Sequence, residues 1–360
     1  MQNPPRIGAC APGRPIGRKL GRQFARPRSI LGLIAACIAT IGTAAAQQPI
    51  ELKVSLFLAA QNPINQEFER WGREVAEKSG GTLVLKMFHA SQMGPLTRQF
   101  DLARTGVADV SFVLHGGTPG RFPLTELAHL PGYLPDAYVA GPAMTALDKE
   151  FLAADHPGVK VLYYTGSQPL PVFTKVPIRQ PSDLKGKRIR AAGTVQSATL
   201  EAFGAVPANI MTPDIPDALS KGMIDGAITG YVGAFAIKLQ EIAKFHTDIH
   251  LGSITFATVM NPKAYESLPP DLRKVIDDTT GMVGARNMGK ALGDGEATGP
   301  EAIKKFGVER LSISPDHPEI RRLAESLEKP AVAALEAKGR PARAFLDRLR
   351  AEVAKQVAAK

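Results

Sequence analysis

The sequence has few residues that could build a disulfide framework or a thiolate site. Its 360 residues include two cysteines, Cys10 and Cys37, and both lie within the first 46 residues. The rest of the chain therefore has no disulfide, no cysteine metal ligand and no cysteine nucleophile. The sequence also lacks a G-x-S-x-G elbow, a phosphate-binding loop and a dinucleotide fingerprint, so the common hydrolase and nucleotide-binding classes find no support.

Acidic residues are absent from the first 46 residues, which carry seven basic ones: Arg6, Arg14, Arg18, Lys19, Arg22, Arg26 and Arg28. The other 37 basic and 34 acidic residues leave a net charge of only +3, out of +10 for the whole chain. A strongly basic protein favours nucleic acid as a partner. Because the excess charge belongs to the start of the chain, we expect no nucleic-acid partner.

Charge is also absent from residues 29–46, which contain the apolar run Ile30–Ala39 and end in Ala44–Ala46. A basic stretch, an apolar stretch and small residues are typical of a secretory signal peptide. We predict that residues 1–46 are such a signal, cleaved after Ala46, and that the protein is periplasmic. A transmembrane anchor is the first alternative, although 18 uncharged residues are short for it. A lipoprotein attached through Cys37 is the second.

Strands and helices alternate after the leader. Hydrophobic runs predict strands over 54–58, 82–88 and 107–114, and a helix over 95–104. A helix is also predicted where Ile64, Phe68, Trp71 and Val75 recur at spacings of four, three and four. Strand–helix–strand alternation implies parallel pairing.

The same alternation restarts in the second half. The pattern predicts strands over 159–165, 187–191, 208–211 and 224–229, with helices over 195–203 and 214–220. The last hundred residues are mostly helical in pattern. We therefore predict an α/β fold with mixed, mainly parallel sheets and a helical C-terminal region.

One short pattern occurs in both halves: Gly106-Val107-Ala108-Asp109 and Gly222-Met223-Ile224-Asp225. In each, glycine ends a helix and aspartate leads into an apolar strand. The repetition indicates two similar lobes with a cleft between them. We assign residues 47–167 plus about 256–295 to the first lobe. Residues 168–255 and the C-terminal helices to 360 form the second lobe and the lobe-connecting helices.

Five segments carry motifs in a fixed order: Ser91–Gly94 (SQMG), Pro119–Leu124 (PGRFPL), Pro181–Arg190 (PSDLKGKRIR), Glu201–Pro207 (EAFGAVP) and Asp217–Gly226 (DALSKGMIDG). In this order they resemble the solute-binding proteins of TRAP (tripartite ATP-independent periplasmic) transporters, whose motifs include D-L-K-G-x-K-I-R and A-L-x-x-G-x-x-D-G. The resemblance runs from about Leu52 to Asp277.

The resemblance implies a two-lobed, periplasmic-binding-protein-like receptor that closes over a small organic acid. Such a receptor delivers its ligand to the membrane permease subunits of the transporter and performs no chemistry on it. We therefore predict a small carboxylate and a TRAP permease as partners, and neither an enzyme, a cofactor nor a metal. We expect a monomer. Members of the family bind carboxylates chiefly through an arginine at the end of the K-I-R strand, which is Arg190 here.

Arginine suits this role because its guanidinium stays protonated when buried and offers a planar pair of donors to a carboxylate. Two positions depart from the family pattern. Leu170 stands where many members carry a second arginine, and Thr229 stands where acid-sugar members carry asparagine. The loss of a cation and an amide favours a monocarboxylate. Tyr231, Phe235 and Phe256 would suit an aromatic or branched one, or could belong to the core.

Three further residues are candidates for ligand contact: Asn62 in the first turn, His115 after the third strand, and Gln168. Each could equally be a cap or loop residue. His246 and His250 are four residues apart, but their surroundings predict a strand rather than a helix, so we predict no metal site there. Two other functions remain as alternatives: a periplasmic enzyme on a related two-lobed fold, and a receptor that serves a signalling protein.

Overall fold

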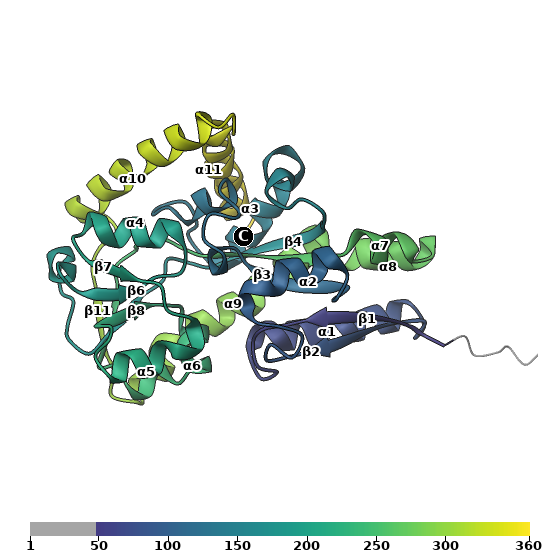
Figure 1. Cartoon of the computed structure of the whole chain (residues 1–360), viewed down its shortest axis with the longest axis horizontal. Helices are drawn as coiled ribbons and strands as arrows, with labels where there is room; N and C mark the ends of the chain where they lie inside the picture. Colours follow the sequence, from purple (N-terminus) through teal and green to yellow (C-terminus); the bar gives the residue numbers. More distant parts are fainter. Residues whose placement is uncertain (1–47) are drawn as a thin grey trace, which may run out of the picture. The chain divides into compact units, whose positions relative to one another are not determined.

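Two β-sheets form the centres of two lobes in the structure, a computed structural model that describes residues 48–360 (Figure 1). The predicted signal peptide, with Cys10 and Cys37, lies outside the described residues. The predicted two-lobed α/β fold is confirmed.

The first sheet has the strand order β2-β1-β3-β10-β4. Its strands are β1 (Ile50–Ser55), β2 (Leu83–Phe88), β3 (Val110–Leu114), β4 (Lys160–Gly166) and β10 (Thr255–Met260). β1 pairs in parallel with β2 and β3, whereas β10 is antiparallel to β3 and β4. The sheet is therefore parallel except for β10, which comes from much later in the chain.

The second sheet has the order β11-β9-β5-β8-β6-β7. Its strands are β5 (Val172–Thr174), β6 (Arg188–Arg190), β7 (Val206–Ala208), β8 (Gly226–Ile228), β9 (Phe245–Asp248) and β11 (Glu309–Ser312). Only β5 runs against its neighbours, β8 and β9. Both sheets thus have one reversed strand, as a mixed and mainly parallel arrangement requires.

Helices cover both sheets (Figure 1). They are α1 (Pro63–Lys78), α2 (Gln99–Thr105), α3 (Ala137–Ala146), α4 (Thr194–Ala202), α5 (Ile215–Ser220), α6 (Tyr231–Ala236), α7 (Pro262–Ser267), α8 (Pro270–Thr279), α9 (Gly281–Lys304), α10 (Pro318–Glu336) and α11 (Ala342–Ala358). The predicted stripe of Ile64, Phe68, Trp71 and Val75 is the buried face of α1. The predicted helical C-terminal region is also present.

The repeated Gly-x-x-Asp turn has the same geometry in both lobes. Gly106 and Gly222 both have left-handed backbones, with φ of 78° and 69°. Asp109 accepts a hydrogen bond from the Lys53 amide of β1, and Asp225 accepts one from the Arg188 amide of β6, both at 2.7 Å. Each aspartate therefore joins its strand to the neighbouring parallel strand, which is a longer-range role than the local turn we predicted.

Two strand-to-strand linkers cross between the sheets, both at the same edge of each sheet. Residues 167–171 leave the carboxyl end of β4 and enter β5, and residues 249–254 leave β9 and enter β10. The two crossings bond to each other, since the Ser167 amide donates to the Ile254 carbonyl (2.9 Å) and the Leu170 amide to the Gly252 carbonyl (3.0 Å). This pair of crossings forms a hinge between the lobes.

Two long helices also span both lobes. On α9, Gly284 and Gly289 pack against the first lobe at Tyr163 and Ala137, and Gly299 packs against Tyr231 of α6. On α10, Ile320 lies in the core of the second sheet, whereas Val332 and Leu335 lie in a core of the first lobe. α11 adds Phe345, Leu346 and Leu349 to that first-lobe core. The residue boundaries that we assigned to the two lobes remain a prediction.

Candidate functional site

The carboxyl edges of the two sheets face each other across the hinge. Gly116, after β3, and Gly193, after β6, come so close that a Cβ on Gly193 would lie 3.0 Å from the Gly116 Cα. The Thr194 hydroxyl at the start of α4 donates to the Glu126 carboxylate of η3 (Thr125–His129) at 2.5 Å. Ligands of open α/β sheets bind outside the carboxyl ends of the strands. This edge is therefore the candidate binding cleft.

Arg190 occupies the carboxyl end of β6, between β7 and β8. Ile189 before it is fully buried in the second-lobe core, and Arg188 is exposed. The Arg190 side chain is only 7% exposed. Strand alternation thus places Ile189 and Arg190 on opposite faces, while the strand end brings Arg190 to the cleft.

Three hydrogen bonds hold the Arg190 guanidinium. Nε donates to the Ile210 carbonyl (3.0 Å), Nη1 to the Ile228 carbonyl (3.2 Å) and Nη2 to the Thr212 hydroxyl (3.1 Å). A guanidinium has five N–H groups. One N–H on each terminal nitrogen therefore remains, which is the pair that a carboxylate engages in a bidentate contact.

Arg190 forms no ion pair with any acidic side chain of residues 48–360. Burial lowers the pKa of its guanidinium to about 10, so the group is still charged at neutral pH. A buried charge without a counter-charge is costly. The guanidinium is therefore not part of a structural salt bridge within the described residues.

Thr212 is a part of this site that the sequence did not indicate. It begins η7 (Thr212–Asp214), which follows β7, and the loop before it also supplies the Ile210 carbonyl. Nothing in the local sequence distinguishes this threonine from a turn residue. Its role depends on a contact with Arg190, 22 residues away along the chain.

Thr229 follows β8 directly and is 7% exposed. It lies next to Ile228, whose carbonyl holds Arg190. Its own amide donates to the Pro171 carbonyl of the hinge at 3.3 Å. Thr229 is therefore next to a residue that holds the guanidinium, and its own hydroxyl lies 3.5 Å from the Gly230 carbonyl oxygen. Its predicted contact with the ligand stays a prediction.

Gln168 contacts a carboxylate of the protein. Its side-chain amide donates to Glu296 of α9 at 2.6 Å. Glu296 also accepts from the amides of Tyr231 (2.8 Å) and Val232 (3.0 Å) at the start of α6. Burial raises the pKa of Glu296, and these donors oppose the shift. Glu296, which the sequence did not indicate, joins α9, the hinge and the segment after Thr229.

Tyr231 and Phe235 pack within the second lobe. The Tyr231 hydroxyl lies 2.9 Å from Nδ1 of His246, and its ring packs edge-on against Phe173. Phe235 packs against Phe306. No described contact brings either ring to Arg190, so their proposed role as ligand contacts has no support from the geometry.

On the first-lobe side, aromatic rings stack across the sheet. Phe112 lies between Phe57 and Phe256, with ring centroids 5.7 and 4.9 Å apart and nearly parallel planes. Phe256 is 6% exposed, whereas Phe57 is only partly buried. Asn62 is the N-cap of α1, and its side chain accepts from the Ile64 amide at 3.0 Å. Phe256 is thus core, and Asn62 has a structural bond.

Phe57 belongs to a partly buried apolar set at the carboxyl edge of the first sheet: Phe57, Leu58, Leu96 and Ile254. Phe57 and Leu58 follow β1, and Leu96 follows β2. Ile254 precedes β10, whose reversed direction brings its start to this edge. We call this set the apolar wall. It lies at the edge that faces the second lobe.

His115 is fully buried within a hydrogen-bonded chain of three histidines. Its Nδ1 lies 2.7 Å from the Thr255 hydroxyl, and its Nε2 lies 2.9 Å from Nε2 of His156. The Thr255 hydroxyl also lies 2.7 Å from Nε2 of His129. Burial lowers the pKa of all three imidazoles. His115 is therefore committed to the first-lobe core.

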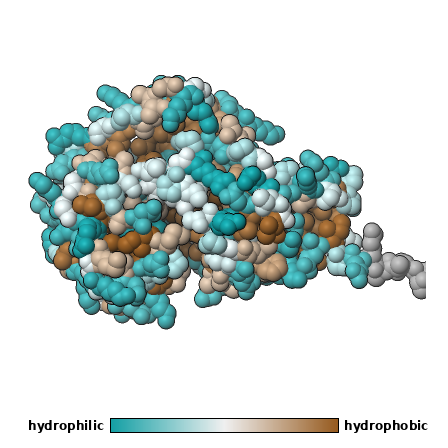
Figure 2. Space-filling view, in the orientation of Figure 1, coloured by the Kyte–Doolittle hydropathy of each residue, from teal (hydrophilic) through white to brown (hydrophobic). Residues whose placement is uncertain are grey.

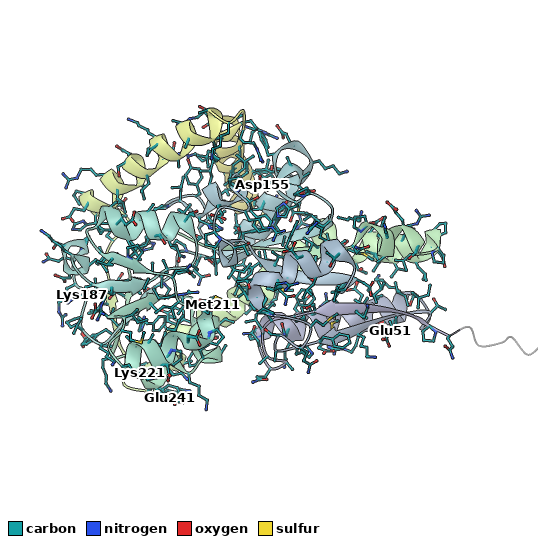
Figure 3. All side chains as sticks on the ribbon, in the orientation of Figure 1. Glu51, Asp155, Lys187, Met211, Lys221 and Glu241 are labelled. Carbon is teal, nitrogen blue, oxygen red and sulfur yellow. The ribbon has the colours of Figure 1, made fainter. Side chains whose placement is uncertain are left out.

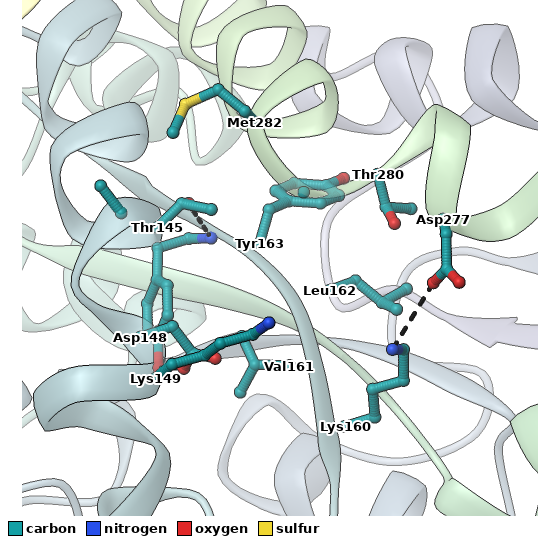
Figure 4. A pocket seen from close by; sticks show the side chains of 13 residues that line it. Thr145, Asp148, Lys149, Lys160, Val161, Leu162, Tyr163, Asp277, Thr280 and Met282 are labelled. Atoms are coloured by element: carbon teal, nitrogen blue, oxygen red, sulfur yellow. Dashed lines mark hydrogen bonds and ion pairs between the residues drawn. The ribbon is translucent and has the colours of Figure 1, made fainter.

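A surface pocket of about 360 Å³ lies elsewhere, between β4 and the start of α9 (Figure 4). An ion pair of Lys160 with Asp277 (3.5 Å) crosses it. None of the predicted site residues lines this pocket. On the face shown in Figure 2, hydrophobic side chains reach the surface in separate patches with hydrophilic ones between them.

Within residues 48–360, no three histidine, cysteine or acidic side chains converge as a metal site would require. His246 lies in β9, and His250 follows in a loop with a left-handed backbone. In the same range, no helix combines the length and the apolar character needed to cross a membrane.

The protein-family model that describes the bacterial extracellular solute-binding proteins of family 7 matches residues 54–331 of the sequence. The chain belongs to this family. The match covers both sheets except the first four residues of β1, and it includes α9 and most of α10. The predicted family and the predicted class of receptor are confirmed.

Solved structures of similar receptors match the whole fold. A TRAP solute-binding protein from Rhodoferax ferrireducens T118, in complex with copurified benzoate, is 30% identical with a TM-score of 0.82, over 86% of this chain and 99% of that chain. A marine-metagenome TRAP solute-binding protein specific for aromatic acid ligands, in complex with 3-hydroxybenzoate, is 28% identical with a TM-score of 0.82 over 86% and 99%. These are solute-binding proteins, not enzymes.

One relative known by sequence is the outer membrane transporter protein TsaT of Comamonas testosteroni. It is 28% identical over 266 residues, which are 71% of this chain and 77% of that protein. This family 7 receptor thus shares its fold with the solved solute-binding proteins.

Proposed function

We propose that this TRAP receptor captures an aromatic monocarboxylate between its lobes, with Arg190 as the carboxylate anchor. The observation that carries the proposal is the buried Arg190 guanidinium, held by three neutral acceptors and lacking an acidic partner in the described residues. A bound carboxylate would supply the missing counter-charge.

The charge of the cleft supports one carboxylate rather than two. Leu170, at the position where related receptors carry a second arginine, is 2% exposed and packs in the second-lobe core. A second carboxylate of a ligand would therefore lack a cation at that position. Burying an unpaired carboxylate is strongly unfavourable, so a dicarboxylate should bind more weakly.

The apolar wall supports an aromatic body. A charge-assisted hydrogen bond contributes about 1.5–3 kcal/mol, while micromolar affinity needs about 8 kcal/mol. Arg190 alone cannot supply this, so burial of apolar ligand surface must contribute much of the rest. The two similar receptors named above hold benzoate and 3-hydroxybenzoate, and we expect the same class of ligand to pack against this wall.

The test is calorimetric titration with benzoate and succinate. Wild type should bind benzoate in the micromolar range and succinate at least tenfold more weakly. Arg190→Met, which keeps the length of the side chain but not its charge, should abolish benzoate binding. Arg188→Met in the same strand is the matched control and should bind as wild type, because Arg188 is exposed and pairs with Asp225.

Two results would overturn the proposal: unchanged benzoate affinity in Arg190→Met, or stronger binding of succinate than of benzoate by wild type. Circular dichroism spectra of both variants serve as the control that each variant is folded.

We further infer that the receptor is exported through cleavage after Ala46, acts as a monomer and delivers its ligand to TRAP permease subunits. The mass of the mature protein checks the cleavage site, and light scattering checks the monomer. Co-expression with a TRAP permease and measurement of benzoate uptake checks the delivery.

A further inference from the structure

One large hydrophobic side chain stands exposed beside the Arg190 site. Met211 lies between Ile210 and Thr212, whose carbonyl and hydroxyl both bind the guanidinium. Its side chain bonds to neither and is 38% exposed. The loop thus turns its two polar groups toward Arg190 and leaves the thioether on the surface.

The topology places this thioether at the cleft. Met211 follows β7, which runs parallel to β6, so both Met211 and Arg190 lie at the carboxyl ends of their strands. Figure 3 shows Met211 between the two lobes, while Lys187 and Lys221, which precede β6 and β8, lie at the outer edge of the second lobe.

The chemistry of Met211 fits the proposed ligand. The apolar wall of the first lobe lies at the edge that faces the second lobe, so an aromatic body extending from Arg190 has that wall on one side. A thioether is flexible and polarisable and makes favourable contacts with aromatic rings. A methionine side chain can adapt its shape to rings with different substituents. A small polar residue at position 211 could not do this.

We propose that Met211 is a specificity-determining residue, which covers the aromatic body of a ligand whose carboxylate is bound by Arg190. This rests on the proposed function, since it assigns the second-lobe side of the same pocket. Closure of the lobes would then bring the ring between Met211 and the apolar wall.

The experiment compares benzoate with propionate, a carboxylate without a ring, in Met211→Ala, Met211→Leu and Met223→Ala. Met223 is the matched control: it is 59% exposed and lies before β8, at the opposite edge of the second sheet. Affinities are measured by calorimetry, with displacement of propionate by benzoate where propionate binds weakly.

Met211→Ala should weaken benzoate binding about three- to tenfold, as expected for the loss of a methionine–aromatic contact, and leave propionate within twofold. Met211→Leu should retain more benzoate affinity, and Met223→Ala should match wild type. If Met211→Ala weakens the binding of both ligands equally, or of neither, this inference is wrong. The proposed function would still stand in that case, provided that Arg190→Met abolishes benzoate binding. A wild type that binds no aromatic carboxylate would instead overturn the proposed function.

Discussion

At the scale of single residues, Arg190 has an environment that serves binding better than stability. Its guanidinium is buried, its pKa is lowered, and its partners are two backbone carbonyls and one hydroxyl. Carbonyls and hydroxyls orient a cation without neutralising it. The charge is therefore not neutralised within the described residues, and the orientation of the guanidinium depends on those three acceptors.

Thr212 is the one side chain among the three acceptors, so it can be tested. Thr212→Val keeps the shape but removes the acceptor for Nη2, so the guanidinium should lose its fixed orientation. We expect benzoate affinity to fall about tenfold, the loss of roughly one hydrogen bond to a charged group. Thr212→Ser should restore binding. The measurement is calorimetry, with the melting temperature without ligand as a check on the fold.

A valine variant that binds benzoate as wild type does would show that Thr212 has no positioning role. Equal weakening in the serine variant would point to general damage of the loop instead.

At the scale of elements, sequence periodicity predicted the helices and strands whose partners are near in the chain. β2 and β6 were predicted within one residue of their observed bounds, and the stripe predicted for a first helix is the buried face of α1. The first strand was predicted over 54–58, whereas β1 is Ile50–Ser55. A strand was expected around His246, where β9 lies, but β5 was not predicted, because three residues next to prolines carry little periodic signal. β10 was missed as a strand because its pairing with β3 and β4 joins residues about a hundred positions or more apart.

The residues of the candidate site also fall into two groups: those that a local sequence motif marks, and those that only long-range contacts reveal. Arg190 and Thr229 stand at strand ends that local motifs mark, and the structure brings them together. Thr212 and Glu296 carry contacts that depend on the fold of the loop and on the path of α9, which no local pattern reveals. Ring chemistry alone suggested three aromatic residues as ligand contacts: Tyr231, Phe235 and Phe256. In the structure, Phe256 packs in a core of the first lobe, and the other two pack in a core of the second lobe.

The glycines of α9 show how a helix can touch both lobes closely. A Cβ on Gly289 would lie 2.6 Å from the Ala137 carbonyl oxygen, a backbone atom that cannot move aside. The helix therefore needs a bare backbone face there, although glycine in a helix costs about 1 kcal/mol relative to alanine.

We expect Gly289→Ala to destabilise the protein by at least about 2 kcal/mol, because overpacking against backbone outweighs the gain in helix propensity. Gly72→Ala in α1 is the control, since its Cβ would lie 3.0 Å from the flexible end of Met87 and at ordinary contact distance from Leu85. That variant should be neutral or slightly stabilised. Urea denaturation measures both. Equal stabilities of the two variants would contradict this account of α9.

At the scale of the whole molecule, buried histidines predict a dependence of stability on pH. Burial lowers the pKa of His115, His129, His156, His246 and His250. Unfolded histidines bind protons near pH 6.5, whereas these cannot do so in the folded state until lower pH. The unfolded state thus binds more protons as pH falls, and stability must fall with it.

The melting temperature should be nearly constant above pH 7.5 and decrease as pH falls below about 6.5. Each fully neutral histidine contributes a loss of about 1.4 kcal/mol per pH unit there. Burial raises the pKa of two carboxyl groups, those of Glu126 and Glu296, and this stabilises the folded state as pH falls. We expect the five histidines to outweigh these two carboxyl groups. Calorimetry between pH 8 and 5.5 checks this. A melting temperature that rises toward pH 5.5 would show that the carboxylates dominate.

The two Gly-x-x-Asp turns have a practical consequence for watching this receptor at work. Val107 and Met223 are 50% and 59% exposed, one on each lobe, and both precede strands whose other ends form the cleft. After Ala46 the chain has no cysteine of its own. A thiol placed at either turn would therefore be unique, and a pair of fluorescent dyes there would follow the movement of the lobes from outside the ligand's reach.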